Sequence, residues 1–264
     1  MDVLEKIIAD KKREVALKKS IIPVSQLENS VLFNSRTNSL SKLLQHSTSG
    51  IIAEHKRKSP SKQTINSSFT VEEVAIGYQN AGVCGISVLT DMKYFGGSLD
   101  DLVLARASVT IPLLRKEFIV DEYQLFEAKA HGADVILLIA AVLTRQEIKH
   151  LSEFAQSLGL EVLLEVHNAE ELQKAIMSSL NMIGVNNRNL KTFDVSLNYS
   201  KELANLIPNE FVKVSESGIS NSSDVKELQQ FGYQGFLIGE NFMKTDNAGL
   251  AASEFIKEVS RLKI

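Results

Sequence analysis

Charged or amide side chains stand where five short apolar runs of this sequence end. Side chains of these types can move protons to and from a substrate and can bind its charged groups. Charges that crowd together are costly unless they pair or act on a substrate. If the fold brings this set to one place, that place is a candidate active site. The set comprises two lysines, three carboxylates and an amide: Lys56, Lys116, Glu54, Glu165, Glu216 and Asn186.

The apolar runs recur at intervals of roughly 20 to 35 residues, which is the length of a βα unit. Each run is rich in β-branched residues or leucine, and an amphipathic stretch follows it. Near-continuous apolar strands that alternate with helices predict a parallel sheet covered on its outer face. The eight runs are 51–53, 85–89, 111–114, 135–139, 162–164, 182–185, 212–214 and 235–238.

Helix-start signals lie between these runs. Residues 70–73 and 144–147 each read as a capping box, and Ser220 or Asn221 can cap a stretch that Gly232 ends. Eight βα units predict an α/β fold, the closed (β/α)8 TIM barrel, with an open doubly wound sheet as the alternative. In the closed barrel the carboxyl ends of the strands form the active-site face, so the charged set would meet there.

The register of the first and third runs predicts which side chains enter the barrel. Side chains alternate across a strand, so Ile52, Glu54 and Lys56 share one face. Lys116 lies on the inward face of the third run. We therefore expect Glu54 and Lys56 to enter the barrel mouth, with Lys56 close to a carboxylate. His55 points to the other face and is assigned no catalytic role.

The length of 264 residues suits one (β/α)8 barrel, and no change of composition marks a second domain. We expect residues 1–264 to form a single domain, with residues 1–49 as a helical extension packed on the barrel. Apolar residues between Val3 and Ile8 fall on one face of a helical stretch. The cations from Lys11 to Lys19 are expected to form its solvated face.

Composition argues against several classes of protein. The net charge of −3 gives no electrostatic case for binding nucleic acid or an anionic membrane. The longest apolar run, Val135 to Leu143, is too short to span a bilayer. The single cysteine, Cys84, allows no internal disulfide and is expected to be buried, and the five histidines show no ligand spacing. The N-terminus lacks a signal peptide's apolar core, so a reducing cytoplasm is expected.

Glycines after the last two runs predict an anion site. Ser217 and Gly218 follow the seventh run, and Gly239 follows the eighth. Glycine lets backbone N–H groups approach a phosphate closely, and a short helix N-terminus can add its dipole. Phosphate binding after the seventh and eighth strands recurs in (β/α)8 barrels. We therefore expect a phosphorylated small molecule as the ligand.

Eight stretches of the chain closely resemble the signature segments of indole-3-glycerol-phosphate synthases. They occur in the family's order, and the resemblance runs from the N-terminal helix almost to the end of the chain. The resemblance implies a TIM barrel that acts on 1-(2-carboxyphenylamino)-1-deoxyribulose 5-phosphate by ring closure, decarboxylation and dehydration. It implies no metal and no organic cofactor. The stretches are Ile51–Lys62, Leu89–Asp91, Tyr94–Ser98, Leu114–Asp121, Glu165–His167, Gly184–Leu190, Ser215–Ile219 and Leu237–Gly239.

The resemblance also assigns catalytic roles. Lys116 would be the general acid of ring closure, since a lysine near carboxylates keeps its proton until it is needed. Lys56 would bind the substrate carboxylate and act as an acid in dehydration. Glu165 would be the base that restores aromaticity, with Glu54 as its rival. Which lysine acts at which step stays open.

The remaining site residues are assigned to binding. Asn186 and Glu216 would orient the substrate and its hydroxyls. Arg188 is either a helper beyond Asn186 or part of a surface salt bridge. The phosphate would be held by Ser59, Ser217, Gly218 and Gly239.

The sequence departs from the family at Glu240, where many members carry a small residue such as serine. A carboxylate would repel a phosphate dianion, so we expect the Glu240 side chain to turn out of the pocket. Its backbone N–H and that of Gly239 would still face the anion. Residues 59–68 are polar and follow the first strand, so we expect a mobile loop that closes over the substrate.

Three other functions compete with this interpretation. They are another phosphosugar barrel such as phosphoribosylanthranilate isomerase, a Schiff-base aldolase that uses Lys56 or Lys116 as nucleophile, and a barrel that only binds. An isomerase needs no array of two lysines and three glutamates, and a binding barrel has no reason to carry the whole set. The sequence leaves the oligomeric state open, and a monomer is the working expectation.

Overall fold

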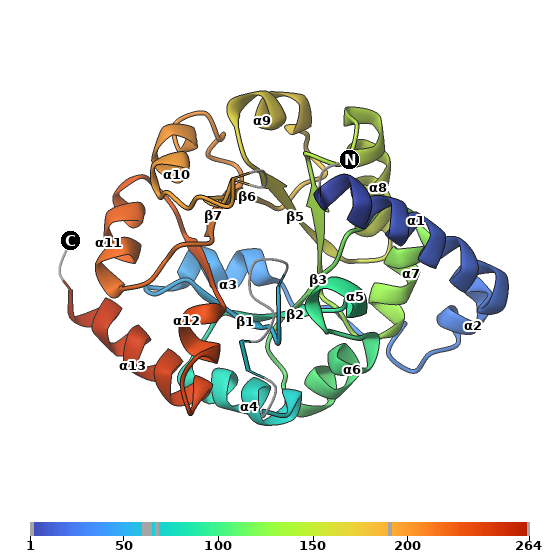
Figure 1. The fold of residues 1–264 in the computed structure, drawn as a ribbon, viewed down its shortest axis with the longest axis horizontal. Helices are drawn as coiled ribbons and strands as arrows, with labels where there is room; N and C mark the ends of the chain where they lie inside the picture. The colour runs from blue at the N-terminus through green and yellow to red at the C-terminus, as the bar shows by residue number, and fades with distance from the viewer. Residues whose placement is uncertain (1–2, 60–64, 67–68, 190–191, 263–264) are drawn as a thin grey trace.

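The computed structural model describes residues 3–59, 65–66, 69–189 and 192–262. Its eight strands close into a barrel in chain order, and every neighbouring pair is parallel (Figure 1). Pairing of the first strand with the last excludes the open sheet, because an open sheet leaves both edges unpaired. The strands are β1 (Ile51–His55), β2 (Gly85–Leu89), β3 (Leu113–Lys116), β4 (Val135–Ile139), β5 (Glu161–Val166), β6 (Met182–Asn186), β7 (Val212–Glu216) and β8 (Gly235–Ile238).

A ring of helices surrounds the barrel, one after each strand (Figure 1). Two short helices, α5 (Met92–Phe95) and α12 (Glu240–Met243), lie in the loops that follow β2 and β8. The ring consists of α4 (Val71–Ala81), α6 (Leu99–Ser108), α7 (Tyr123–Ala130), α8 (Arg145–Ser157), α9 (Ala169–Ala175), α10 (Asn198–Leu203), α11 (Ser222–Gln230) and α13 (Ala248–Arg261).

Local signals start and stop these helices as the sequence predicts. Thr70 and Thr144 each accept a hydrogen bond from a backbone N–H three residues on, and the glutamate there caps in return. Asn221, rather than Ser220, caps α11. Gly232 adopts φ +85° after that helix, a conformation that glycine reaches without strain. The capping predictions are therefore confirmed.

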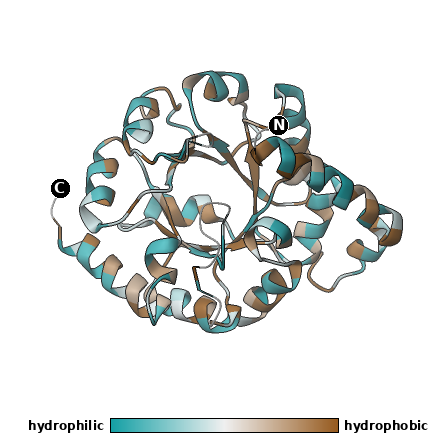
Figure 2. Ribbon diagram, in the orientation of Figure 1, coloured by the Kyte–Doolittle hydropathy of each residue, from teal (hydrophilic) through white to brown (hydrophobic). Residues whose placement is uncertain are grey.

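The apolar core has two layers, which follow from the alternation of side chains along each strand. Ile51 and Ala53 pack outward against the helices, whereas Ile52 points into the barrel with Leu114 and Leu163. The strands are accordingly the most hydrophobic part of the molecule, and the helices are mixed (Figure 2). Polar side chains at the carboxyl ends therefore stand on an apolar, filled interior.

The third strand begins two residues later than the apolar run from which it was predicted. The run starts at Ile111, but β3 starts at Leu113 and continues to Lys116. Pro112 has no amide hydrogen to donate to a neighbouring strand, although its carbonyl accepts from Ile86. The extension to Lys116 places that lysine within the strand. Cys84, just before β2, is buried and free, as expected.

The segment before the barrel forms three helices, α1 (Val3–Ile21), α2 (Val24–Glu28) and α3 (Leu40–His46). Both α1 and α2 pack against α7, so part of this segment covers the barrel's side. α3 contributes Leu40 and Leu44 to the interior apolar layer, next to strand residues such as Val212. Within the described residues, no helix combines the length and apolarity needed to cross a bilayer.

The prediction that the cations from Lys11 to Lys19 form the solvated face of α1 is wrong at Lys11. Lys11 is only 2% exposed and shares the buried face with Ile7 and Val15. These positions are spaced by four residues, so they line up on one side of a helix. Val3, which was placed on the apolar face, is 44% exposed. The charge of Lys11 can be buried because carboxylates from two barrel loops surround it.

Candidate active site

A cavity of about 360 Å³ opens at the carboxyl ends of the strands. All eleven residues that the sequence predicts for the site line it. They come from strands and loops far apart in the chain, and closure of the barrel brings them together. They are Glu54, Lys56, Ser59, Lys116, Glu165, Asn186, Arg188, Glu216, Ser217, Gly218 and Gly239.

Lys116 is the centre of the charged cluster. Its Nζ lies 3.3 Å from Oε2 of Glu165 and forms a closer ion pair with Glu216. Burial by itself would lower the pKa of Lys116, but the carboxylates of Glu216, Glu165 and Glu54 outweigh it and raise the pKa above the usual value. Lys116 therefore carries its proton at neutral pH.

The two carboxylates beside Lys116 differ in their protonation. Burial raises the pKa of Glu216 to about 7, since repulsion from Glu165 and Glu54 adds to burial and Lys116 offsets only part. Glu165 is as deeply buried, yet Lys116, His167 and a hydrogen bond from Asn186 bring its pKa below the usual value. Glu165 is thus the group of the pair that stays ionised and can accept a proton.

Glu54 and Lys56 form a second ion pair at the rim. Lys56 Nζ lies 2.6 Å from Oε1 of Glu54, and both side chains line the cavity. The strand register predicted from alternation is therefore confirmed. His55, on the other face, is buried, and burial together with Arg57 lowers its pKa to about 4. A neutral, outward-facing imidazole fits its exclusion from the catalytic set.

Two glycines leave the space that the carboxylates occupy. A Cβ on Gly184 in β6 would lie 2.3 Å from Oε1 of Glu216. A Cβ on Gly239 would lie 2.6 Å from Oε1 of Glu54. Neither separation is possible between non-bonded atoms, so any other residue would displace the acid. Gly239 thus has a steric role beside its predicted contact with phosphate.

The turn after β7 has an unusual backbone. Ser217 and Gly218 both have positive φ, 68° and 79°, so two successive residues are left-handed. Asn187 holds this turn, because its side-chain amide donates to the carbonyl of Ser217 (3.1 Å) and to the hydroxyl of Ser215 (2.9 Å). Sequence reasoning missed Asn187, whose only signal was its place in the motif beside Asn186. Its buried amide fixes the loop predicted to bind phosphate.

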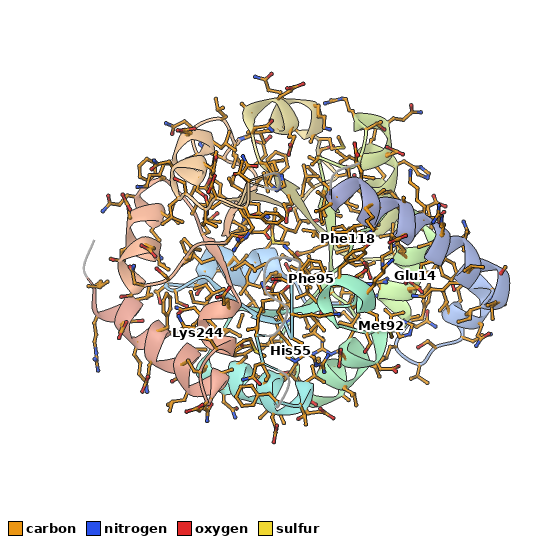
Figure 3. The ribbon with its side chains drawn as sticks, in the orientation of Figure 1. Glu14, His55, Met92, Phe95, Phe118 and Lys244 are labelled. Carbon is orange, nitrogen blue, oxygen red and sulfur yellow. The ribbon has the colours of Figure 1, made fainter. Side chains whose placement is uncertain are left out.

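An aromatic wall closes one side of the cavity. The rings of Phe95, from α5, and Phe118, after β3, have centroids 5.9 Å apart and lie near the barrel mouth (Figure 3). Leu137, Ile139 and Leu237 continue this apolar surface at the base of the cavity. Both phenylalanines lie within motif stretches of the sequence, but no role was predicted for them. A planar aromatic group of a ligand fits against such a wall.

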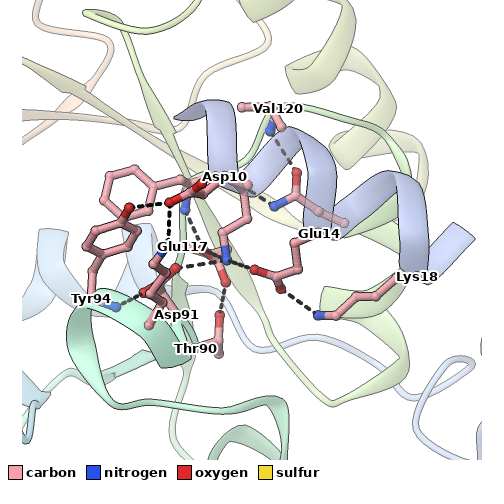
Figure 4. A network of polar contacts seen from close by, with 12 residues as sticks. Asp10, Glu14, Lys18, Thr90, Asp91, Tyr94, Glu117 and Val120 are labelled. Atoms are coloured by element: carbon pink, nitrogen blue, oxygen red, sulfur yellow. Dashed lines mark hydrogen bonds and ion pairs between the residues drawn. The ribbon is translucent and has the colours of Figure 1, made fainter. Parts of the chain in front are cut away.

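The loops that carry this wall are tied to the N-terminal helix through Lys11. Lys11 Nζ lies 2.9 Å from Asp91 Oδ2 and 3.1 Å from Glu117 Oε1 (Figure 4). Asp91 caps α5, which carries Phe95, and Glu117 adjoins Lys116. One buried lysine therefore joins α1 to the loops after β2 and β3.

Three expectations remain predictions at this stage. Arg188 donates to the carbonyl of Phe193 (3.3 Å), and among the described residues no carboxylate forms an ion pair with it. Glu240 is exposed at the start of α12 and lines the cavity. The expected lid, residues 59–68, has positions 60–64 and 67–68 outside the described residues.

The closed barrel and the acid–base cluster at its carboxyl ends define the class of protein: a (β/α)8-barrel enzyme. Solved structures share the fold. They include tryptophan synthase subunit alpha from Legionella pneumophila (TM-score 0.62, 15% identity, covering 86% of this chain and 100% of that one). Another is KGPDC from Streptococcus mutans (TM-score 0.64, 13% identity, 81% and 99% covered). At these identities the likeness shows the fold alone.

The family follows from sequence comparison. A model of indole-3-glycerol phosphate synthase matches residues 4–255. The curated relatives of that name include proteins from Bacteroides thetaiotaomicron (49% identical, 98% of this chain and 99% of the relative covered) and Aliarcobacter butzleri (43%, 92% and 94%). The chain therefore belongs to the indole-3-glycerol phosphate synthase family, carboxy-lyases of tryptophan biosynthesis, and the resemblance seen in its motifs is confirmed. Among the described residues, no group of three or more metal-ligating side chains could hold a metal ion.

Proposed function

We propose that this site converts 1-(2-carboxyphenylamino)-1-deoxyribulose 5-phosphate into indole-3-glycerol phosphate. One observation carries the proposal: Lys116, whose side chain is 16% exposed, lies between Glu165 and Glu216 inside a cavity with an aromatic wall, and these carboxylates raise its pKa. Ring closure, decarboxylation and dehydration need an acid, a base and a dry aromatic site, and this arrangement offers all three.

Lys116 is proposed as the acid of ring closure. The aryl carbon that bears the carboxylate attacks the ketone carbon, and the carbonyl oxygen takes a proton as it becomes a hydroxyl. Carbon dioxide then leaves, and its bonding electrons restore the benzene ring. Lys116 supports this role because it lies deep in the cavity and the surrounding carboxylates keep it protonated.

The last step removes the new hydroxyl as water and a proton from the neighbouring carbon. Lys56, at the rim, is proposed to bind the substrate carboxylate and to give the proton that leaves with the hydroxyl. Glu165 is proposed as the base. Its rival Glu54 already pairs with Lys56 at 2.6 Å, whereas the pKa of Glu165 is held low. The ionised Glu165 is therefore better placed to accept the proton.

The other residues are proposed to bind the substrate. Asn186 and Glu216 would orient its hydroxyls, and Arg188 would assist beyond Asn186. Ser217 and Gly218 are both left-handed in the turn after β7, and successive backbone N–H groups in turns can bind an anion. The phosphate would lie against Ser59, Ser217, Gly218 and Gly239, which line one part of the cavity.

We further propose that residues 1–264 fold as one domain, with residues 1–49 as its packed extension. The contacts of α1 and α2 with α7 support this. We propose a cytoplasmic monomer that binds no nucleic acid. The net charge of −3 gives no electrostatic case for binding nucleic acid, and the free Cys84 suits a reducing compartment. Sedimentation at micromolar concentration tests the monomer.

Incubation of the chain with the carboxyphenylamino-deoxyribulose phosphate tests the activity. We expect indole fluorescence to appear with turnover and to be lost in a Lys116→Met variant. Borohydride added with the substrate should trap no adduct, because no lysine acts as a nucleophile in this scheme. A trapped adduct on Lys56 or Lys116, or no fluorescence from the folded wild type, would overturn the proposal.

A further inference from the structure

A histidine outside the predicted catalytic set contacts the proposed base. His167 directly follows β5, and alternation places it on the same side as Glu165. Its Nε2 lies 3.5 Å from Oε1 of Glu165, while Lys116 contacts Oε2, the other oxygen. Nε2 is buried and has no hydrogen-bond partner within the described residues. The histidine is therefore placed for charge interaction with Glu165 rather than for a well-formed hydrogen bond.

Helix α9 fixes the other side of the ring. His167 Nδ1 lies 3.2 Å from Oε2 of Glu171, which also accepts the backbone N–H of His167 (2.9 Å). The side chain of Asn168 donates to the second oxygen of Glu171 (2.9 Å). Glu171 is thus held by three contacts and orients the imidazole, so that Nε2 faces Glu165.

The surrounding charges favour the cationic form of His167. Burial lowers its pKa, but the hydrogen bond to Glu171 and the charges of Glu165, Glu171 and Glu216 outweigh burial and raise it. The groups that face Glu165 are Lys116 from β3, Asn186 from β6, Glu216 from β7 and His167 itself. Glu165 therefore has Lys116 at one oxygen and, at the other, an imidazole whose cationic form the neighbouring carboxylates favour.

These two groups behave differently during the proposed reaction. Lys116 becomes neutral when it gives its proton to the carbonyl oxygen, whereas His167 does not take part in that step. We propose that His167 is a positioning residue that keeps Glu165 ionised and aimed at the substrate after Lys116 has lost its charge. This inference rests on the proposed roles of Lys116 and Glu165.

A second cavity borders His167 beside the catalytic cavity, and the two cavities share Asn186 and Arg188 among their lining residues. The second cavity has a volume of about 530 Å³ and is lined by His167, Glu171, Lys174 and Tyr199 but not by Glu165. His167 lines this second cavity and contacts Glu165, which lines the catalytic cavity. The effect of His167 on Glu165 should accordingly be visible in kcat as well as in kcat/KM.

The test is the pH profile of a His167→Gln variant, which keeps a donor toward Glu171 but carries no charge. Loss of a cation beside Glu165 makes its protonation easier, so activity should be lost at higher pH. We expect the acid limb of kcat and kcat/KM to move up by roughly one to three pH units. His167→Lys should keep the limb near its original position. His150→Gln is the matched control, because exposed His150 pairs with Glu122 (2.6 Å) away from the site.

A second measurement separates Glu165, whose pKa is lowered, from Glu216, whose pKa burial raises to about 7. The NMR titration of His167, identified by its absence in the glutamine variant, should move to lower pH in Glu165→Gln. An unmoved titration, or a His167→Gln variant that is slower by the same factor at every pH, would refute the role of His167. If Glu165→Gln turns over normally, the assignment of the base fails instead, whatever His167 does.

Discussion

Replacement of Lys11 by methionine tests whether the buried cation holds the N-terminal helix to the barrel. Methionine keeps most of the volume of the lysine stem, so the change removes charge rather than packing. Asp91 and Glu117 lose the ammonium that both contact within 3.1 Å. Their contacting oxygens can then be no more than about 6 Å apart, where two charges repel by roughly 3 kcal/mol at an effective dielectric near 20.

Hydrogen bonds that Asp91 and Glu117 accept from other groups limit the loss of stability. The hydroxyl of Thr90 donates to Glu117 (2.9 Å), and the backbone N–H of Tyr94 donates to Asp91 (2.6 Å). Breaking a buried pair by removing one partner costs about 3–5 kcal/mol, and we expect the lower end here. The free energy of unfolding, measured by urea titration and circular dichroism, should therefore fall by about 3 kcal/mol.

Two further variants isolate the cause. Lys12→Met, one residue along on the exposed side of α1, should change the unfolding free energy by less than about 0.5 kcal/mol. Lys11→Met combined with Glu117→Gln should recover part of the loss, because one of the two unpaired charges is gone. The reasoning is refuted if Lys11→Met is as stable as Lys12→Met. It is also refuted if Glu117→Gln lowers the stability of the Lys11→Met variant by as much as it lowers that of the wild type.

Three further variants address the cavity. Lys116→Met should lower kcat by about 10²–10⁴ while binding of the phosphorylated product, measured by calorimetry, stays within a few fold; near-normal turnover would remove the lysine from the mechanism. Gly184→Ala should push Glu216 away from Lys116, since the added Cβ would lie 2.3 Å from Oε1 of Glu216. The loss of kcat in steady-state assays, expressed as a free energy, should then exceed the loss in the free energy of unfolding. Glu240→Ser should change KM by less than about threefold, and a large gain in affinity would show that the carboxylate faces the phosphate.

Features set by neighbours in the chain could be read from the sequence. A capping box joins residues three positions apart, so Thr70 and Thr144 indicated their helices without any tertiary information. Alternation along one strand is equally local, and it correctly placed Glu54 and Lys56 in the mouth and His55 outside. The start of β3 was harder, because Pro112 shifts the start of pairing with the neighbouring strand.

Features that depend on distant partners were missed or misjudged. Lys11 was interpreted as solvated, since a buried lysine is rare unless it is paired, and its partners Asp91 and Glu117 lie far along the chain. The spacing of Lys11 from Ile7 and Val15 was the only available signal. The contact of Phe95 with Phe118 likewise depends on how two loops meet above the barrel.

The sequence by itself determined the number and kind of βα units, the family and the residues that can do the chemistry. It did so because hydrophobic periodicity, helix caps and motifs are properties of short segments. Only the tertiary structure decided that Lys116 lies between Glu165 and Glu216, that His167 reaches the far oxygen of Glu165, and that one of these glutamates stays ionised more readily than the other. Protonation depends on burial and on the distances between charges, and both are fixed only when the barrel closes.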